Sequence, residues 1–166
     1  MIFGEIPNGA SVFLDANTFV YAFSQHSQFG PACRGLLERI DRGEISGLTS
    51  THVLLETAHR LMTLEACSIF GWPFAGIAQR LSRHPVEVQQ LSAHSQAVNQ
   101  IINSQIKVIS IAPELVLAAT DFSRQHGLLT NDALIVAVMQ ASGLTSIASH
   151  DADFDRVPAL TRYTPA

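Results

Sequence analysis

The sequence predicts an α/β fold in which a central parallel sheet is flanked by helices on both faces. Short apolar segments alternate along the chain with longer segments of helical spacing, and strands separated by helices form right-handed crossovers in a parallel sheet. Hydrophobic residues make up 47% of the 166 residues and charged residues only 14%, as in a globular protein with a well-covered sheet. The chain has no internal repeat, low-complexity tract or linker, so we expect a single domain over residues 1–166.

The first elements are a strand and two helices. Residues 11–14 form a short apolar strand, and Asp15 lies at its C-terminal edge. Helical spacing follows through Tyr21. A second helix is expected from Pro31 to Arg42, because three apolar side chains in this segment share one helical face.

The next elements are a brief strand and a long helix. Residues 48–50 can form the strand, preceded by a turn that Gly43 and Gly47 bracket, and Ser50 or Thr51 can cap the following helix. That helix is expected from His52 to Ile69, where the sequence Gly-Trp-Pro soon afterwards stops it.

Four more helices and two more strands complete the expected order. Pro113 suits the first turn of its helix, and Gly143 stands just past the end of the last helix, where glycine is common. The helices are expected at residues 74–81, 92–103, 113–127 and 131–141, and the strands at 107–111 and 145–149, the latter being the last clear strand.

Composition also narrows the class of protein. No apolar run reaches the roughly 18 residues of a membrane span, and the start lacks the basic region and long apolar stretch of a signal peptide. We therefore expect a cytoplasmic protein. Cys33 and Cys67 form no CxxC pair, so neither a zinc site nor a disulfide framework is indicated. Both are expected to be reduced and buried.

The charge balance bears on nucleic-acid binding. The net charge is −4, and Lys107 is the only lysine. A protein that grips nucleic acid mainly through phosphates carries a basic surface, so this balance counts against tight, sequence-independent binding. Nucleic acid remains a possible substrate, because a carboxylate cluster loaded with divalent cations becomes locally positive.

Acidic residues fall where an open parallel sheet builds its sites, beyond the carboxyl ends of the strands. Asp15 follows the first strand, and Asp151 follows the last. Asp132 opens a helix whose next seven residues are all apolar, and such a helix is buried, so it delivers the carboxylate to a covered end of the sheet. Glu56 lies in the helix after the second strand, and no Ser or Thr three residues earlier makes it a capping-box acid.

Each acid also has a purely structural interpretation. Asp15 can cap the helix that follows it, and Glu56 can pair with Arg60 at i, i+4. Asp132 can complement the helix dipole, and the three acids of segment 151–155 can be turn formers on a solvated loop. The combination favours a site, since several of only 14 acids occupy the places where such sheets bind ligands.

Four segments stand in order along the chain: Phe13–Tyr21, Leu55–Ala58, Thr130–Ala137 and Ile147–Asp155. They resemble the successive motifs of PIN domains, and among these the VapC-type ribonuclease toxins of type II toxin–antitoxin systems. The resemblance runs from about residue 11 to the end of the chain. The first and the last two segments are fairly specific, and the second gains weight only from its place in the order.

The resemblance implies a PIN-like sheet, an acidic quartet around Mg²⁺ or Mn²⁺, and hydrolysis of RNA phosphodiesters. Asp15 matches the first acid, Glu56 the second and Asp132 the third. Asp151 matches the last, and Asp153 is close enough to share or replace it.

Other polar residues stand beside these acids. Asn17, Thr130 and Ser149 can support the acids through hydrogen bonds or hold metal-bound water, or they can simply cap helices and turns. His150 is a possible substrate contact. The remaining histidines accompany no HExxH or CxxC motif, which argues against zinc.

The resemblance also implies partners: an RNA substrate, a cognate antitoxin that occludes the acids, and a second copy of the chain in a homodimer. Two alternatives stay open. One is a PIN-fold nuclease that processes RNA or cuts structured DNA, and the other is a catalytically silent PIN-fold binding module. The segment 67–91 is longer than a compact member needs, and it is expected to cover the core unless it forms a dimer or partner surface.

Overall fold

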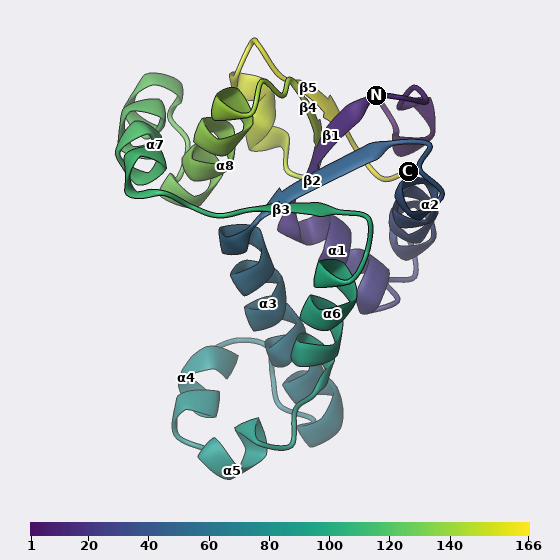
Figure 1. Cartoon of the computed structure of the whole chain (residues 1–166). Helices are drawn as coiled ribbons and strands as arrows, with labels where there is room; N and C mark the ends of the chain where they lie inside the picture. The colour runs from purple at the N-terminus through teal and green to yellow at the C-terminus, as the bar shows by residue number, and fades with distance from the viewer.

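Five parallel strands form the sheet at the centre of this computed structural model, which describes residues 1–166 (Figure 1). Their order is β3-β2-β1-β4-β5, and every neighbouring pair is parallel. The predicted α/β fold is therefore confirmed. The strands are β1 (Ser11–Leu14), β2 (Ser46–Ser50), β3 (Lys107–Ile109), β4 (Ser146–Ala148) and β5 (Thr161–Tyr163).

Helices cover both faces of the sheet. Right-handed crossovers place α1, α2, α3 and α6 on one side and α7 and α8 on the other (Figure 1). The helices are α1 (Ala16–Phe23), α2 (Gly30–Asp41), α3 (Thr51–Phe70), α4 (Ile77–Ser82), α5 (Pro85–Val88), α6 (Ala93–Ile102), α7 (Pro113–His126) and α8 (Thr130–Ala141), with short 3-10 helices η1 (Phe3–Glu5) and η2 (Ala152–Arg156).

Helix α8 lies in the main core, as its apolar run predicts. Ala133 and the five residues 135–139 are buried in a cluster of 30 residues that also contains the buried residues of β1 and β4. Its first turn carries Asp132 to the edge of that core. No helix is both long and apolar enough to cross a membrane.

The strand order reverses at β1. The chain runs outward from β1 through β2 to β3 and then returns to β4, on the other side of β1. Such a reversal is the topological switch point at which open α/β sheets bind ligands. The carboxyl ends of β1 and β4 therefore mark where a site is to be sought.

Several sequence-based expectations need correction. The strand expected at 145–149 is not the last, because β5 pairs with it at residues 161–163. Gly47 does not bracket a turn but lies within β2, against the side chain of Ile40. Residues 74–76 precede α4 rather than belong to it, and Cys67 is half-buried rather than buried.

The segment 67–91 departs furthest from expectation. Helices α4 and α5 project away from the sheet (Figure 1). Ile77, Leu81 and Leu91 form a small separate cluster with Ala66 of α3, so the segment has its own core and does not cover the main one. Phe74 is 67% exposed.

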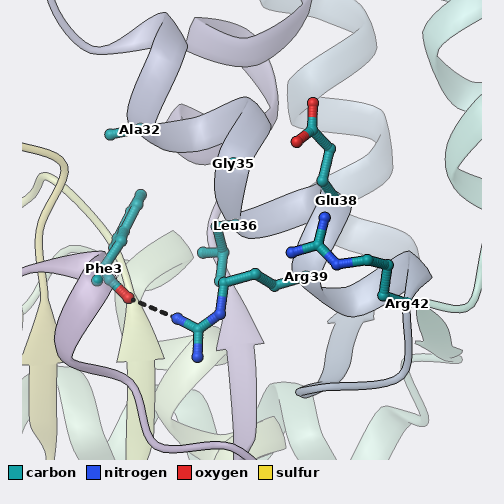
Figure 2. Close-up of a pocket in the computed structure, with 8 residues that line it drawn as sticks. Phe3, Ala32, Gly35, Leu36, Glu38, Arg39 and Arg42 are labelled. Carbon is teal, nitrogen blue, oxygen red and sulfur yellow. Dashed lines mark hydrogen bonds between the residues drawn. The ribbon is translucent and has the colours of Figure 1, made fainter.

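The ten residues before β1 are tied to α2 by Arg39. Its guanidinium donates to the carbonyl oxygens of Phe3 (3.2 Å) and Ile6 (2.7 Å) and to Asn8 Oδ1 (2.9 Å). The hollow of about 390 Å³ between η1 and α2 lies beside these bonds (Figure 2). Arg39 also pairs with Glu44 at 3.3 Å, so its donors hold this segment against α2.

Candidate active site

The reversal of strand order places Asp15 beside the segment that contains Asp151. Leu14 of β1 is in register with Ala148 of β4, so Asp15 and Ser149 each follow the last paired residue. The backbone N–H of Asp15 donates to the carbonyl of Ala148 at 3.2 Å. Asp15 is 6% exposed. The topology thus brings together Asp15 and Ser149, two predicted site residues that are 134 positions apart in the chain.

Both oxygens of the Asp15 carboxylate accept hydrogen bonds. Oδ1 accepts from the N–H of Ala16 at 2.6 Å, so Asp15 does cap α1, as its structural interpretation expected. Oδ2 accepts from Ser149 Oγ at 2.7 Å and from the side-chain amide of Asn17. These donors favour the ionised carboxylate and fix its orientation.

Asn17 and Ser149 also extend the network to the loop after β4. Asn17 Oδ1 accepts from the backbone N–H of His150, and Ser149 Oγ accepts from that of Asp151, both at 3.0 Å. The two side chains therefore tie the start of α1 to the start of η2. Thr130, by contrast, is exposed as the first residue of α8 and makes no side-chain hydrogen bond.

Glu56 and Asp132 reach the same region from helices on opposite sides of the sheet. Ser50 caps α3 by accepting from the N–H of Val53 at 3.4 Å, and Glu56 follows within two turns. Asp132 stands in the first turn of α8. Both side chains are half-buried.

The electrostatics show that these acids share one environment. Burial raises the pKa of Asp15 to about 7, partly offset by the hydrogen bonds from Ser149 and Ala16 and reinforced by the charges of Glu56 and Asp132. Burial likewise raises the pKa of Asp132 to about 6, reinforced by the charges of Asp151, Glu56 and Asp153. The acids matched to the family motif thus repel one another at the edge of the sheet.

Two of the acids also have cationic neighbours. Glu56 lies 3.9 Å from Arg60, the i, i+4 pair of its structural interpretation, and Asp153 lies 3.0 Å from Arg156. Asp151 is exposed and caps η2 by accepting from the N–H of Asp153 at 2.9 Å. The contacts of the structural interpretation are therefore present at Glu56 and in the turn that begins at Asp151.

The donor chemistry suits a hard divalent cation, since carboxylate oxygens are the ligands that Mg²⁺ and Mn²⁺ prefer. As the side chains stand, however, no three acids, histidines or cysteines form a ready-made ligand set. Holding a cation with three of these acids therefore requires side-chain movement. Asp155 is paired elsewhere: Arg162 donates two hydrogen bonds of 2.8 Å to its carboxylate, and they lower its pKa.

A cleft of about 330 Å³ opens beside the acids, and two of the residues that line it were not predicted as site residues. Tyr21 and Arg60 line it together with Asn17, His150 and Asp151. Their spacing from predicted site residues is the signal in the sequence that could have indicated them. Tyr21 follows Asn17, and Arg60 follows Glu56, by four residues, which places each pair on one face of its helix.

Comparison with known proteins identifies the family of the chain. The PIN domain family profile matches residues 12–160. No curated protein matches the chain in sequence.

Solved structures that share the fold include toxin–antitoxin proteins. VapBC2 from Rickettsia felis, bound to a DNA fragment from its promoter, is 19% identical with a TM-score of 0.58, over 94% of this chain and 99% of that one. Mycobacterium tuberculosis VapC20, described as a sarcin–ricin loop cleaving toxin, is 19% identical with a TM-score of 0.61, over 87% and 92%. A toxin–antitoxin complex from Klebsiella pneumoniae is 16% identical with a TM-score of 0.51, over 90% and 95%.

At these identities the structural similarity establishes the fold, and the profile match establishes the family. The matched region contains all four candidate acids, the strand reversal at β1 and the cleft beside it. This chain belongs to the PIN domain family.

Proposed function

We propose that this protein is a metal-dependent ribonuclease and that it acts as the toxin of a toxin–antitoxin pair. One observation carries the proposal. Four acids from β1, α3, α8 and the loop after β4 share one environment at the switch point of a PIN-family sheet, where Asp15 and Asp132 have raised pKa values. Burial of an ionisable carboxyl and repulsion from neighbouring acids both cost stability, and groups perturbed in this way gather at functional sites.

In this proposal Asp15, Glu56, Asp132 and Asp151 hold Mg²⁺ or Mn²⁺, with Asp153 able to share or replace Asp151. The cation, when bound, supplies an acidic water and stabilises charge on the phosphate oxygens. The protein's own contribution is to position the acids. Asn17 and Ser149 fix the orientation of the Asp15 carboxylate, and such supporting hydrogen bonds tune the affinity of metal ligands.

RNA as the substrate and an antitoxin as the partner are supported by the structural neighbours. One neighbour is described as cleaving the sarcin–ricin loop, and two others are toxin–antitoxin assemblies. An antitoxin that places an arginine among the acids would neutralise their negative charge, and its planar guanidinium can bind a carboxylate in a bidentate manner. Association of two copies of the chain is part of the same proposal, and light scattering that shows only monomer would remove it.

A cleavage assay tests the proposal. Purified protein is incubated with single-stranded RNA and with tRNA, in Mg²⁺, in Mn²⁺ and in EDTA. We expect cleavage only with metal, and none from the Asp15→Asn variant. Asp41→Asn is the matched control, because Asp41 is an exposed acid at the end of α2, and it should cleave like the wild type.

The other functions give different results in the same assay. Full activity in a well-folded Asp15→Asn protein would exclude this site. Metal-dependent cleavage of structured DNA in preference to any RNA would identify a DNA nuclease instead. A folded wild-type protein that neither cleaves RNA nor binds Mn²⁺ by calorimetry would be a silent binding module.

A further inference from the structure

An aromatic wall stands beside the acids, and the proposed chemistry does not use it. It consists of Tyr21, His26, Phe29 and His150. The ring centroids of Phe29 and His150 are 4.4 Å apart, those of Tyr21 and Phe29 are 5.3 Å apart, and those of Tyr21 and His150 are 5.9 Å apart. His26 stacks on Phe29 at 5.1 Å, with ring planes 9° apart. Rings from α1, the loop after it and the loop after β4 therefore form one continuous surface.

Backbone hydrogen bonds hold the loop that carries two of these rings. The N–H of His26 donates to the carbonyl of Tyr21 at 3.1 Å, and the N–H of Gly30 donates to that of His26 at 2.8 Å. The N–H of Phe29 donates to His26 Nδ1 at 3.2 Å. A Cβ at Gly30 would stand 3.0 Å from the Tyr21 carbonyl oxygen, so any larger residue there would push the loop away from α1 by a few tenths of an ångström. The loop is thus folded tightly back onto α1.

The wall opens onto the cleft. Tyr21 is half-buried and His150 is exposed, and both line the cleft together with Arg60. The cleft also contains Asn17, whose side chain is hydrogen-bonded to Asp15. A group seated on the rings would therefore lie next to the acids, with the partly exposed guanidinium of Arg60 within the same cleft.

The charge of the protein bears on how it could bind RNA. The chain has 10 Lys and Arg residues against 14 acids, and four arginines other than Arg60 are in ion pairs of 2.6–3.3 Å. Arg60 lies 3.9 Å from Glu56, the longest of these separations. A protein with so few free cations cannot hold RNA mainly through phosphates. Unpaired bases bind instead by stacking on aromatic and histidine rings, a contact that tolerates any base.

We propose that Tyr21 and His150, whose ring planes meet at 71°, line a subsite for one unpaired nucleobase next to the scissile phosphate. The base stacks on Tyr21 and meets His150 with its edge, and Arg60 contacts the adjoining phosphate. The inference rests on the proposed ribonuclease function and makes it more specific. RNA must be single-stranded, or able to extrude a base, at the nucleotide that flanks the cut. The subsite accepts any of the four bases and so selects for accessibility rather than for sequence.

Fluorescence of 2-aminopurine tests the subsite without catalysis. The base analogue is placed at each position in turn of a single-stranded oligoribonucleotide, and wild-type protein is titrated in EDTA. We expect quenching at one position. Tyr21→Leu should remove the quenching and weaken binding about 10-fold, the cost of one base stack. Tyr21→Phe should retain both, because it keeps the ring.

The controls separate the subsite from the fold. Phe74→Leu removes an exposed aromatic ring from the projecting segment and should behave like the wild type. His150→Leu should lose part of the quenching, since the second ring that contacts the base is missing. Thermal unfolding checks that each variant is folded. Unchanged quenching and affinity in both Tyr21→Leu and His150→Leu would overturn the inference.

Cleavage of the same oligonucleotides in Mn²⁺ distinguishes the two proposals. If the wild type cleaves them and Tyr21→Leu cleaves with a raised KM, both proposals hold. If Tyr21→Leu cleaves with unchanged KM, the subsite is wrong and the ribonuclease stands. If the wild type neither binds nor cleaves RNA, the ribonuclease fails and the subsite with it. Loss of antitoxin binding alone in Tyr21→Leu would make the wall a protein interface instead.

Discussion

Asp15 is both a helix cap and a buried acid. It caps α1 through one oxygen and receives the side chains of Ser149 and Asn17 on the other. A cap on an exposed helix would keep its pKa near the ordinary value, whereas burial next to Glu56 and Asp132 raises it to about 7. The cost of ionising this residue in the absence of a cation is therefore a measurable property of the site.

That cost predicts how stability depends on pH. Between the ordinary pKa of 3.8 and the raised value of about 7, the folded protein retains a proton that the unfolded chain releases. The free energy of unfolding in EDTA should therefore fall as pH rises through this window. Asp15→Asn removes the effect, so from pH 4 to pH 8 the difference between variant and wild type should shift in the variant's favour by about 2–4 kcal/mol. Urea unfolding at both pH values measures it, and parallel pH profiles would show that Asp15 is not buried as an acid.

Ser149 is predicted to act on cation binding through Asp15. Ser149→Ala removes a hydrogen bond of 2.7 Å to the carboxylate and leaves the N–H of Asp151 without its acceptor. Mn²⁺ affinity should fall about 10- to 100-fold, the usual effect of losing such a partner. Ser146→Ala, the same change at the start of β4, should leave the affinity unchanged by calorimetry. Equal affinities in the two variants would remove Ser149 from the site.

At the scale of elements, prediction succeeded where a pattern was long or chemically distinctive. The strand at 11–14 and the buried helix after Asp132 stand as expected, because unbroken apolar runs report burial directly. The sequence does not predict strand β5 or helix α5, because Thr-Arg-Tyr and Pro-Val-Glu-Val contain no continuous apolar run like those of the other short strands. The sequence predicts a turn at Gly47 because glycine serves both turns and close packing, and only tertiary structure distinguishes the two.

Packing of α2 on β2 gives the prediction for this scale. A Cβ at Gly47 would stand 2.8 Å from Cδ1 and 3.0 Å from Cγ2 of Ile40. Gly47→Ala should therefore lower the free energy of unfolding by about 1–3 kcal/mol, the usual cost of overpacking. The cost should shrink in an Ile40→Val background, which lacks Cδ1, and a double-mutant cycle measures this coupling.

Gly35→Ala is the matched control for that cycle. Gly35 belongs to α2 and borders the hollow of Figure 2, where a Cβ would meet nothing within 4 Å. The variant should be neutral or more stable by up to about 1 kcal/mol, because alanine favours helix. An equal loss in Gly35→Ala and Gly47→Ala would mean that the close approach to Ile40 is not the cause.

For the whole molecule, the order of the strands is what assembles the site. The sequence could place Asp15 and Asp151 after strands, but only the strand order shows that those strands are neighbours. The sequence does not predict Tyr21 and Arg60 as site residues for the same reason: their shared cleft depends on how α1 and α3 lie against the loop after β4. The roles of the acids remain proposals that rest on this arrangement.

The charge of the whole molecule predicts a shallow salt dependence. Arg60 is the cation of the cleft, so binding of single-stranded RNA in EDTA should involve about one or two phosphates. A plot of log affinity against log salt should then have a slope of about −0.7 to −1.4. Titrations in increasing KCl measure it. A slope steeper than about −3 would reveal a phosphate track elsewhere on the surface and contradict binding through a base.

The most direct test of the central claim is to locate Mn²⁺ by anomalous diffraction in crystals grown with the ion. We predict an anomalous peak at the carboxyl edge of the sheet, bound by Asp15 and Asp132, with the Glu56 side chain moved away from Arg60. No peak is expected in crystals of the Asp15→Asn variant grown the same way. A peak only at a distant surface, or none among these acids in the wild type, would contradict the claim that this acidic cluster is a metal-dependent nuclease site.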